Sequence, residues 1–351
     1  MSVRIVGAGL IGTSVALALK GAGESVEVSD LNPKSQALAA DLVGASHLQE
    51  PIKLVLVATP VQAISDVLQA EFAENPQAIF MDFGGLKSNL IQEIEKFPDL
   101  SERFISLHPM AGREISGPES ARADLFNSRA ILMTPTTLTN QVTLDAAHSL
   151  VKTLGGTGYL IAANDHDQII SAISHMPQLV STLLGASLVE LESEDLAFSG
   201  GGLRDMTRLA GSDAGLWSEL FLANKVELIR SAHKYSERLD SFIEALENED
   251  REAIKRIIES GNDGRALIPG KHGAQKRDYT FLPVVIDDKA GQLARLFEEC
   301  AAVEVNVEDL SIEHSPGQET GLITLALSES DAIKLQEHLL AAGWRVHSPL
   351  K

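Results

Sequence analysis

Short apolar runs alternate with helical stretches through the first 160 residues of the chain. The runs have the length of buried strands, and the segments between them have the spacing of helices. Strands that alternate with helices predict βαβ crossovers and a mainly parallel sheet covered by helices. The predicted strands cover residues 3–6, 25–29, 54–57, 78–81, 104–107 and 130–133.

From about residue 163 to residue 260 the pattern becomes almost entirely helical. Residues 165–192 and 214–247 form long segments rich in Leu, Ala and Glu at helical spacing. Much of this helical surface is apolar on more than one side, which favours burial against a second subunit of a homodimer. Glycine, proline and asparagine within residues 260–273 predict a linker.

The last part of the chain predicts a separate unit with the element order βαββαβ, which is the ferredoxin-like arrangement. The fold class is therefore α/β with three domains, at residues 1–162, 163–272 and 279–351, of which the second is all-helical and the third is α+β. The expected elements of the third domain are strands at 280–287, 303–314, 321–327 and 344–347, and helices at 292–300 and 331–342.

Composition is that of an ordinary soluble enzyme. The 351 residues are 44% hydrophobic and 22% charged, which suits two or three globular domains. Cys300 is the single cysteine, so neither a disulfide framework nor a cysteine-rich metal site is expected. We expect no apolar stretch near the roughly 20 residues that span a bilayer. The first strand leaves no room for a signal peptide, and a cytoplasmic location is predicted.

The formal net charge of −20 argues against nucleic acid or an anionic membrane as a partner. An anionic substrate would therefore need a local cluster of cationic side chains. Two arginines, Arg204 and Arg208, follow the glycines at 200–202 and are candidates for binding a carboxylate. Either could instead form an ion pair with Asp205 or Asp213.

The first strand runs directly into a G-x-G-x-x-G motif that opens a helix. In this motif the first glycine allows a tight turn, the second lets the backbone approach a pyrophosphate, and the third lets helix pack on strand. Asp30 ends the second strand, where a carboxylate binds ribose hydroxyls and favours NAD over NADP; capping a turn is the alternative. These features predict an NAD-binding Rossmann domain with cofactor contacts at Gly7, Gly9, Leu10, Ile11, Gly12 and Asp30.

Further candidates lie at the carboxyl ends of later strands, which should line the cofactor crevice. Thr59, Pro60 and Gly84 are expected to contact the cofactor. His108 is the strongest candidate base, because a neutral imidazole can accept a proton from a substrate hydroxyl as hydride leaves the adjacent carbon. A histidine satisfied by backbone groups is the alternative. The histidines at 166 and 175 could belong to the site or to the core, and no metal site is predicted.

Six motifs in this order closely resemble the prephenate dehydrogenase family: GAGLIGTS at 7–14, DFGGLK at 82–87, HPMAG at 108–112, DHD at 165–167, SHMP at 174–177 and GGGLRDMTR at 200–208. The resemblance implies oxidative decarboxylation of prephenate to 4-hydroxyphenylpyruvate with NAD. It also implies an active site between a Rossmann domain and a helical dimerisation domain. The roles implied are catalysis for His108 and Lys87, and substrate binding for Arg208, Arg204, His175, Gln178, Glu114 and Trp217.

Two positions depart from the family pattern. Gly85 replaces the usual serine between Asp82 and Lys87, and Gln178 replaces the second histidine of the S-H-x-P-H motif. The second change leaves arogenate open as an alternative substrate, because arogenate differs from prephenate only in having an amino group for the side-chain keto group.

Residues 280–351 resemble an ACT domain, which implies an effector site at Gly291 and Asn306 for tyrosine or phenylalanine. A role in assembly alone is the alternative. A β-hydroxyacid dehydrogenase would need a lysine on the first long helix, and residues 165–192 contain none. A non-catalytic sensor of NAD and amino acids is the remaining alternative, and the presence of both His108 and Arg208 argues against it.

Overall fold

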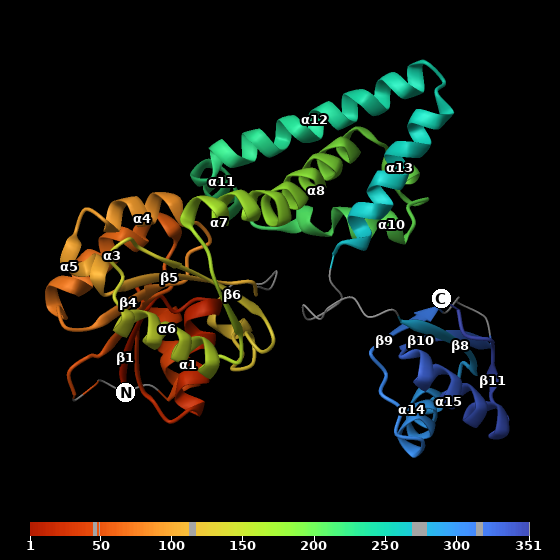
Figure 1. Cartoon of the computed structure of the whole chain (residues 1–351), viewed down its shortest axis with the longest axis horizontal. Coiled ribbons are helices and arrows are strands. Elements are labelled where there is room, and N and C mark those ends of the chain that lie inside the picture. Colours follow the sequence, from red (N-terminus) through yellow and green to blue (C-terminus); the bar gives the residue numbers. More distant parts are fainter. Residues whose placement is uncertain (45–47, 49, 112–116, 269–278, 314–318, 351) are drawn as a thin grey trace. The chain divides into compact units, whose positions relative to one another are not determined.

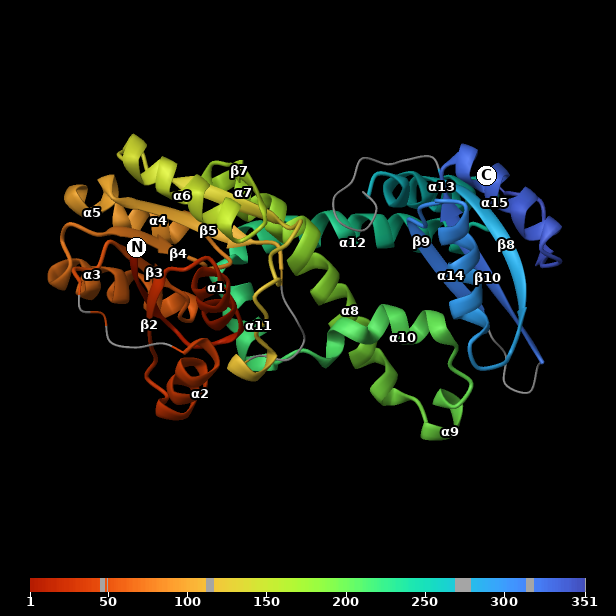
Figure 2. The ribbon, with the colours of Figure 1, turned by 90° about the horizontal axis from the view of Figure 1, so that it is seen from below.

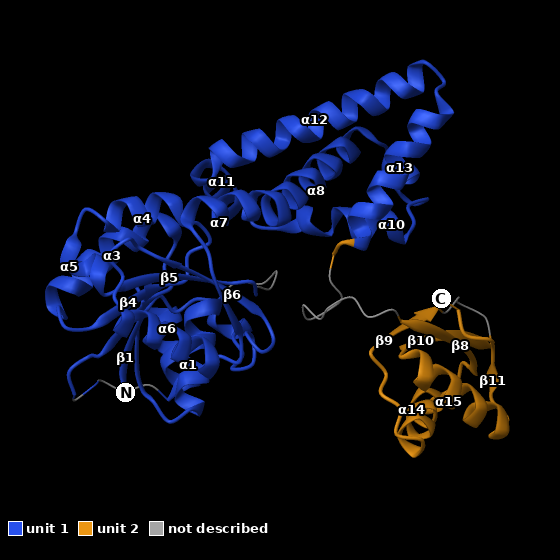
Figure 3. Cartoon of the chain, in the orientation of Figure 1, with its two compact units in different colours: residues 1–266 blue, residues 267–351 orange. Residues whose placement is uncertain are grey.

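The computed structural model describes residues 1–351 except 45–47, 49, 112–116, 269–278, 314–318 and 351. The chain divides into two compact units, residues 1–266 and 267–351 (Figure 3). The first two predicted domains therefore lie within one unit, and each unit is described by itself.

The first unit contains a seven-stranded sheet in the order β2-β1-β3-β4-β5-β6-β7. Only the pairing of β5 with β6 is antiparallel, so the prediction of a mainly parallel sheet is confirmed. The strands are β1 Ser2–Val6, β2 Ser25–Ser29, β3 Leu54–Val57, β4 Ile79–Asp82, β5 Phe104–Pro109, β6 Ala130–Pro135 and β7 Thr157–Leu160. The sequence pattern missed β7, because all four of its residues are exposed and carry no apolar run.

Helices cover both faces of this sheet (Figure 1). Successive residues of a strand face opposite sides, so Leu56 joins one buried apolar cluster while Val55 and Val57 join the other. The helices are α1 Leu10–Gly21, α2 Pro33–Val43, α3 Ile64–Glu74, α4 Ser88–Ile94, α5 Pro98–Glu102 and α6 Gln141–Thr153.

The helical region of the first unit extends away from the sheet (Figures 1 and 2). It contains α7 Ala163–Ile170, a π-helical turn Ser171–His175, α8 Met176–Ser187, α9 Ser193–Leu196, α10 Gly201–Thr207, α11 Ala214–Ala223, α12 Lys225–Glu247 and α13 Arg251–Ala266. The predicted helix at 214–247 is interrupted at Asn224. The predicted linker starts too early, because α13 continues through its glycines to Ala266; residues 269–273 lie outside the described residues.

The expectation that no segment is apolar enough to span a membrane was wrong, because one helical run is long and apolar enough by length and composition alone. The helical run Ala163–Glu190 reaches a mean hydropathy of 1.3, because its polar residues are spread among many Leu, Ile, Val and Ala. A single helix of this kind is weak evidence for a membrane, since a core helix of a soluble protein has the same properties. Buried His166, His175 and Gln178 lie on this run, as in a soluble protein whose helix lines a polar site.

The second unit contains a four-stranded antiparallel sheet in the order β11-β8-β10-β9. Its elements are β8 Thr280–Asp287, α14 Gln292–Ala302, β9 Asp309–Glu313, β10 Thr320–Leu327, α15 Glu329–Ala341 and β11 Arg345–Val346. This element order is the predicted one, although β9 is shorter than the predicted strand at 303–314. Residues 303–308 are not a strand, and Glu304 there has a positive φ of 51°.

Candidate active site

The glycine motif forms a close-packed turn at the start of α1. Gly7 has a φ of +107°, and a Cβ there would lie 2.5 Å from the carbonyl oxygen of Ala58. A Cβ on Gly12 would lie 2.0 Å from the carbonyl oxygen of Gly7, whereas nothing lies within 4 Å of a Cβ on Gly9. Open space therefore remains at the helix N-terminus, next to Leu10 and Ile11, where unpaired N–H groups suit a phosphate.

Asp30 lies beside this turn. Its carboxylate accepts hydrogen bonds from the backbone N–H of Ala8 (2.7 Å) and of Asn32 (2.7 Å). It therefore caps the turn before α2, and the remaining lone pairs on its two oxygens are available to a ribose. Thr59 follows β3 with a buried hydroxyl that has no hydrogen-bond partner among the described residues, and Pro60 after it is exposed. The residues present fit a dinucleotide.

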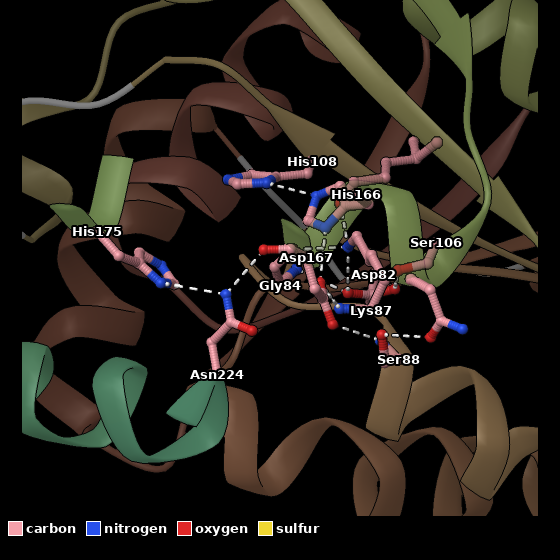
Figure 4. A network of polar contacts seen from close by, with 12 residues as sticks. Asp82, Gly84, Lys87, Ser88, Ser106, His108, His166, Asp167, His175 and Asn224 are labelled. Carbon is pink, nitrogen blue, oxygen red and sulfur yellow. Dashed lines mark hydrogen bonds and ion pairs between the residues drawn. The ribbon is translucent and has the colours of Figure 1, made fainter. Parts of the chain in front are cut away.

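His108 lies near the end of β5 and leads a chain of polar contacts (Figure 4). Its Nδ1 is 2.9 Å from Nε2 of His166, and Nδ1 of His166 is 2.7 Å from Oδ1 of Asp167. The other ring nitrogen of His108 faces Gly85, since a Cβ on Gly85 would lie 3.8 Å from Nε2. Leu220 of α11 closes the same space, with Cδ2 3.9 Å from that Cβ position.

Burial lowers the pKa of all three imidazoles around this space. Desolvation, together with the cation of Lys87 and the neighbouring histidines, holds the pKa of His108 well below its usual range. Burial also lowers the pKa of His166, against the opposing effect of Asp167. The same cause lowers the pKa of His175 to about 4. The rings are therefore neutral at neutral pH, and His108 can accept a proton.

Lys87 is completely buried beneath His108. Its Nζ donates to the carbonyl oxygens of Gly84 (2.6 Å) and Leu107 (2.8 Å) and lies 3.4 Å from Oδ2 of Asp82. Asp82 also accepts from the hydroxyl of Ser106. Lys87 thus ties the loop after β4 to the strand that carries His108, and we propose a positioning role for it in place of the predicted catalytic one.

Asn224, at the break between α11 and α12, connects His175 to the same network. Its side-chain amide donates to the backbone carbonyl oxygen of Asp167 (2.9 Å) and lies 3.2 Å from Nδ1 of His175. Trp217 and Phe221 of α11 pack edge-on against the His175 ring, with centroids 6.0 and 6.1 Å away. The predicted residues His175 and Trp217 are therefore in contact.

Gln178 is buried, and its amide is used within the protein. Its Nε2 donates to the carbonyl oxygen of Leu209 (2.8 Å), and its Oε1 accepts from the hydroxyl of Ser212 (3.4 Å). Ser181, one helical turn further along α8, accepts from the N–H of Ala210 (3.1 Å). Both side chains hold the 3₁₀ turn that begins at Arg208. The amide of Gln178 is therefore bonded to this turn and does not point into open space.

The other predicted site residues are more scattered. Arg204 and Arg208 are exposed on α10 and the turn after it. Glu114 lies outside the described residues. Gly291 and Asn306 belong to the second unit, where Asn306 donates to Glu308 (3.0 Å). No group of three or more metal-binding side chains occurs in the part of the chain that the structure describes.

Comparisons with known proteins agree with this arrangement. Residues 15–160 match the family model of the prephenate dehydrogenase nucleotide-binding domain, and residues 162–260 match that of its dimerization domain. The chain belongs to the prephenate dehydrogenase family. The identification of the chain as a dehydrogenase of this family, made from its motifs, is thereby confirmed.

Individual relatives extend the likeness to the whole chain. A probable prephenate dehydrogenase, NovF of Streptomyces niveus, is 28% identical over 98% of this chain and 99% of its own length. The structure of Aquifex aeolicus prephenate dehydrogenase with hydroxyphenyl propionate and NAD+ has a TM-score of 0.69 and 25% identity, and covers 76% of this chain and 98% of that one. Synechocystis arogenate dehydrogenase has a TM-score of 0.66 and 27% identity, over 76% and 99%.

Sequence reasoning missed the residues that hold the predicted ones in place. In the sequence Asp167 stands out only as part of the DHD motif, and Asn224 belongs to none of the motifs. The available signal for Asp167 was a carboxylate beside a candidate histidine. For Asn224 it was a helix-breaking amide inside a long helical pattern.

Proposed function

We propose that the protein oxidises and decarboxylates prephenate to 4-hydroxyphenylpyruvate, with NAD as the hydride acceptor. The observation that carries the proposal is the placement of His108, whose Nδ1 contacts His166 while Nε2 faces the space beside Gly85. A base there can take the proton of the C4 hydroxyl while CO₂ leaves C1 and the ring becomes aromatic.

The chain's own residues supply binding and proton transfer. His108 accepts the hydroxyl proton at Nε2, and Arg208 pairs with a substrate carboxylate, held in place by the turn that Gln178 anchors. The glycine turn and Asp30 would hold NAD, which would supply the hydride acceptor. The cation of Arg208 is needed in the site because the substrate carries two negative charges and the protein itself has a net charge of −20.

The test follows formation of NADH or NADPH in all pairings of prephenate or arogenate with NAD or NADP. Turnover of prephenate with NAD is the expected result. A preference for arogenate would show that arogenate is the substrate in place of prephenate. Absence of turnover with every pairing would favour a non-catalytic sensor. His108→Asn should bind NAD normally but lose about 10²–10⁴-fold in kcat, since positioned bases contribute that much.

The second unit is proposed to be a ferredoxin-like ACT domain that binds tyrosine or phenylalanine. Its sheet order and element order support this assignment. A pocket of about 320 Å³ is lined by Gln292, the first residue of α14, which follows Gly291 with its φ of +88°. The pocket is lined by Arg295, whose guanidinium could bind a carboxylate, and by Asp287 and Arg345, which form an ion pair with each other.

Two further features complete the proposal. The dimerization-domain match and the exposed apolar side chains of the helical region, such as Phe198 (86% exposed) and Leu222 (71%), support a homodimer. A cytoplasmic location fits a biosynthetic enzyme of this kind.

A further inference from the structure

The backbone around Asp167 allows its carboxylate only one hydrogen-bonding role. Oδ1 accepts from the N–H of Lys87 (2.9 Å) and Oδ2 from the N–H of Ser88 (2.8 Å). Backbone N–H groups can only donate, so the carboxylate must accept on both sides. Burial alone would raise its pKa, but the hydrogen bonds from His166, Ser88 and Lys87 outweigh that effect and lower it, so Asp167 is ionised.

This fixed acceptor determines the proton positions on two histidines. Nδ1 of His166 faces Oδ1 of Asp167 and must carry a proton. Because the neutral ring has one proton, Nε2 of His166 carries a lone pair. That lone pair faces Nδ1 of His108 at 2.9 Å, so His108 is protonated at Nδ1 and has its own lone pair at Nε2. This is the nitrogen that faces the space beside Gly85.

We propose that Asp167 and His166 are positioning residues that hold His108 in the tautomer with a free Nε2 and share the proton that it removes from the substrate. This inference rests on the proposed function for its substrate. When the hydroxyl proton binds Nε2 of His108, the Nδ1 proton can move to Nε2 of His166. The positive charge then lies on His166, paired with the Asp167 carboxylate. One proton enters the three side chains, and no electrons move within them.

Other charges around His108 make this arrangement necessary. Lys87, buried below the ring, opposes a positive charge on His108, and His175 is a further neutral imidazole on the other side. Asp82 is occupied by Lys87, Gly84 and Ser106. Among the residues that the structure describes, Asp167 is therefore the carboxylate that can compensate an imidazolium here.

The decisive measurement is the nitrogen NMR spectrum of the histidine rings in the full chain without substrate. The His108 signals are assigned by their loss in His108→Asn. We expect His108 to be neutral and protonated at Nδ1 at neutral pH. A wild-type His108 protonated at Nε2 would overturn the proposal, and the tautomer itself is read from the wild-type protein.

Asp167→Asn tests the relay in two ways. An asparagine is uncharged and cannot present oxygen to both His166 and the N–H of Ser88, so it fixes the His166 tautomer less firmly and does not compensate an imidazolium. We expect a shift of His108 toward the Nε2-protonated form and a fall in kcat of about 10²–10⁴-fold, as for loss of an orienting carboxylate in other triads. The NAD dissociation constant should change less than threefold.

Asp165→Asn is the matched control, because Asp165 is exposed on the same helix and loses the same charge. It should leave both the tautomer and kcat unchanged. An Asp167→Asn variant that keeps Nδ1 protonation and wild-type kcat would refute the relay. If the wild-type tautomer is as expected but prephenate is not converted, the proposed function fails while the assignment of the His108 tautomer by Asp167 and His166 stands.

Discussion

Gly84 and Gly85 are neighbours in the loop after β4, yet their surroundings differ. A Cβ on Gly84 would lie 2.7 Å from Cδ1 of Ile64 and 2.9 Å from Oδ2 of Asp82, both buried. A Cβ on Gly85 would make only ordinary contacts, the nearest at 3.8 Å from His108. Packing therefore requires a glycine at position 84, whereas the surroundings of Gly85 leave room for a Cβ atom.

We expect Gly84→Ala to lower the free energy of unfolding by about 1–3 kcal/mol, the usual cost of overpacking. Gly85→Ala is the matched control and should stay within about 0.5 kcal/mol of wild type. Urea denaturation of both variants measures the difference. Equal stability of the two variants would contradict the packing around Gly84.

His175 makes stability depend on pH. Its pKa is about 4 in the folded protein and about 6.5 in an unfolded chain, because burial disfavours the charged ring. The unfolded state therefore binds the proton first as the pH falls. The contribution of His175 to the free energy of unfolding is fully present above about pH 6.5 and is lost as the pH falls from about 6.5 to 4. The total loss is about 3 kcal/mol.

The measurement is urea denaturation across this pH range for wild type and His175→Gln. The variant should be less stable at pH 7 but should lose less stability on acidification. Parallel losses in the two proteins would show that His175 does not titrate in this way.

At this scale, the sequence could predict the residues whose chemistry is local. His108 follows an apolar strand, and the glycine motif lies between a strand and a helix, so both could be placed from neighbouring residues. The contacts that orient them could not be placed. Asp167 meets the N–H of Lys87 from 80 positions away, and Asn224 meets Asp167 across 57.

At the scale of elements, Lys87 joins the loop after β4 to β5. Lys87→Met would keep most of the side-chain volume but leave the Asp82 carboxylate buried without its cation. We expect a loss of about 3–5 kcal/mol in the free energy of unfolding. The double variant Lys87→Met/Asp82→Asn should recover part of that loss, because no uncompensated charge remains.

The double variant also tests the role of Lys87. If Lys87 acts only by positioning, kcat should recover along with stability in the double variant. Steady-state kinetics and denaturation of the same samples measure the two quantities. A stable double variant without turnover would return Lys87 to the catalytic role that the sequence motif implies.

Gln178 links α8 to the turn that begins at Arg208. Gln178→Ala removes the donor to the Leu209 carbonyl and should loosen that turn. Because we propose that Arg208 binds the substrate carboxylate both before and during the reaction, we expect KM for prephenate to rise about tenfold with little change in kcat. Gln168→Ala, an exposed change on α7, is the control. A lowered kcat at unchanged KM would contradict this assignment.

The apolar pattern of the sequence predicted the positions of those strands whose apolar residues are buried. The six predicted strands are present because each contributes apolar residues to the buried clusters, whereas exposed β7 carries no such signal. The break at Asn224 and the π-helical turn that ends at His175 arise from tertiary contacts with the site, which helical periodicity cannot show.

At the scale of the whole molecule, the chain consists of two compact units with separate cores. The buried cluster of the second unit contains residues between Leu282 and Leu339, and those of the first unit lie between Val3 and Leu154. Each unit therefore has the apolar core that independent folding requires. The polar network around His108 lies in the first unit, and the pocket beside Gly291 lies in the second.

This separation predicts that activity and effector binding can be divided. A chain ending at Ile268 should keep NAD-dependent turnover of prephenate but lose any change in rate caused by tyrosine or phenylalanine. Arg295→Ala in the full chain, which changes the lining of the pocket in the second unit, should weaken the same response. Circular dichroism establishes that each variant is folded, and initial rates at increasing amino-acid concentration measure the response. Equal responses in the full and shortened chains would place the effector in the first unit, because the second would then be unnecessary for it.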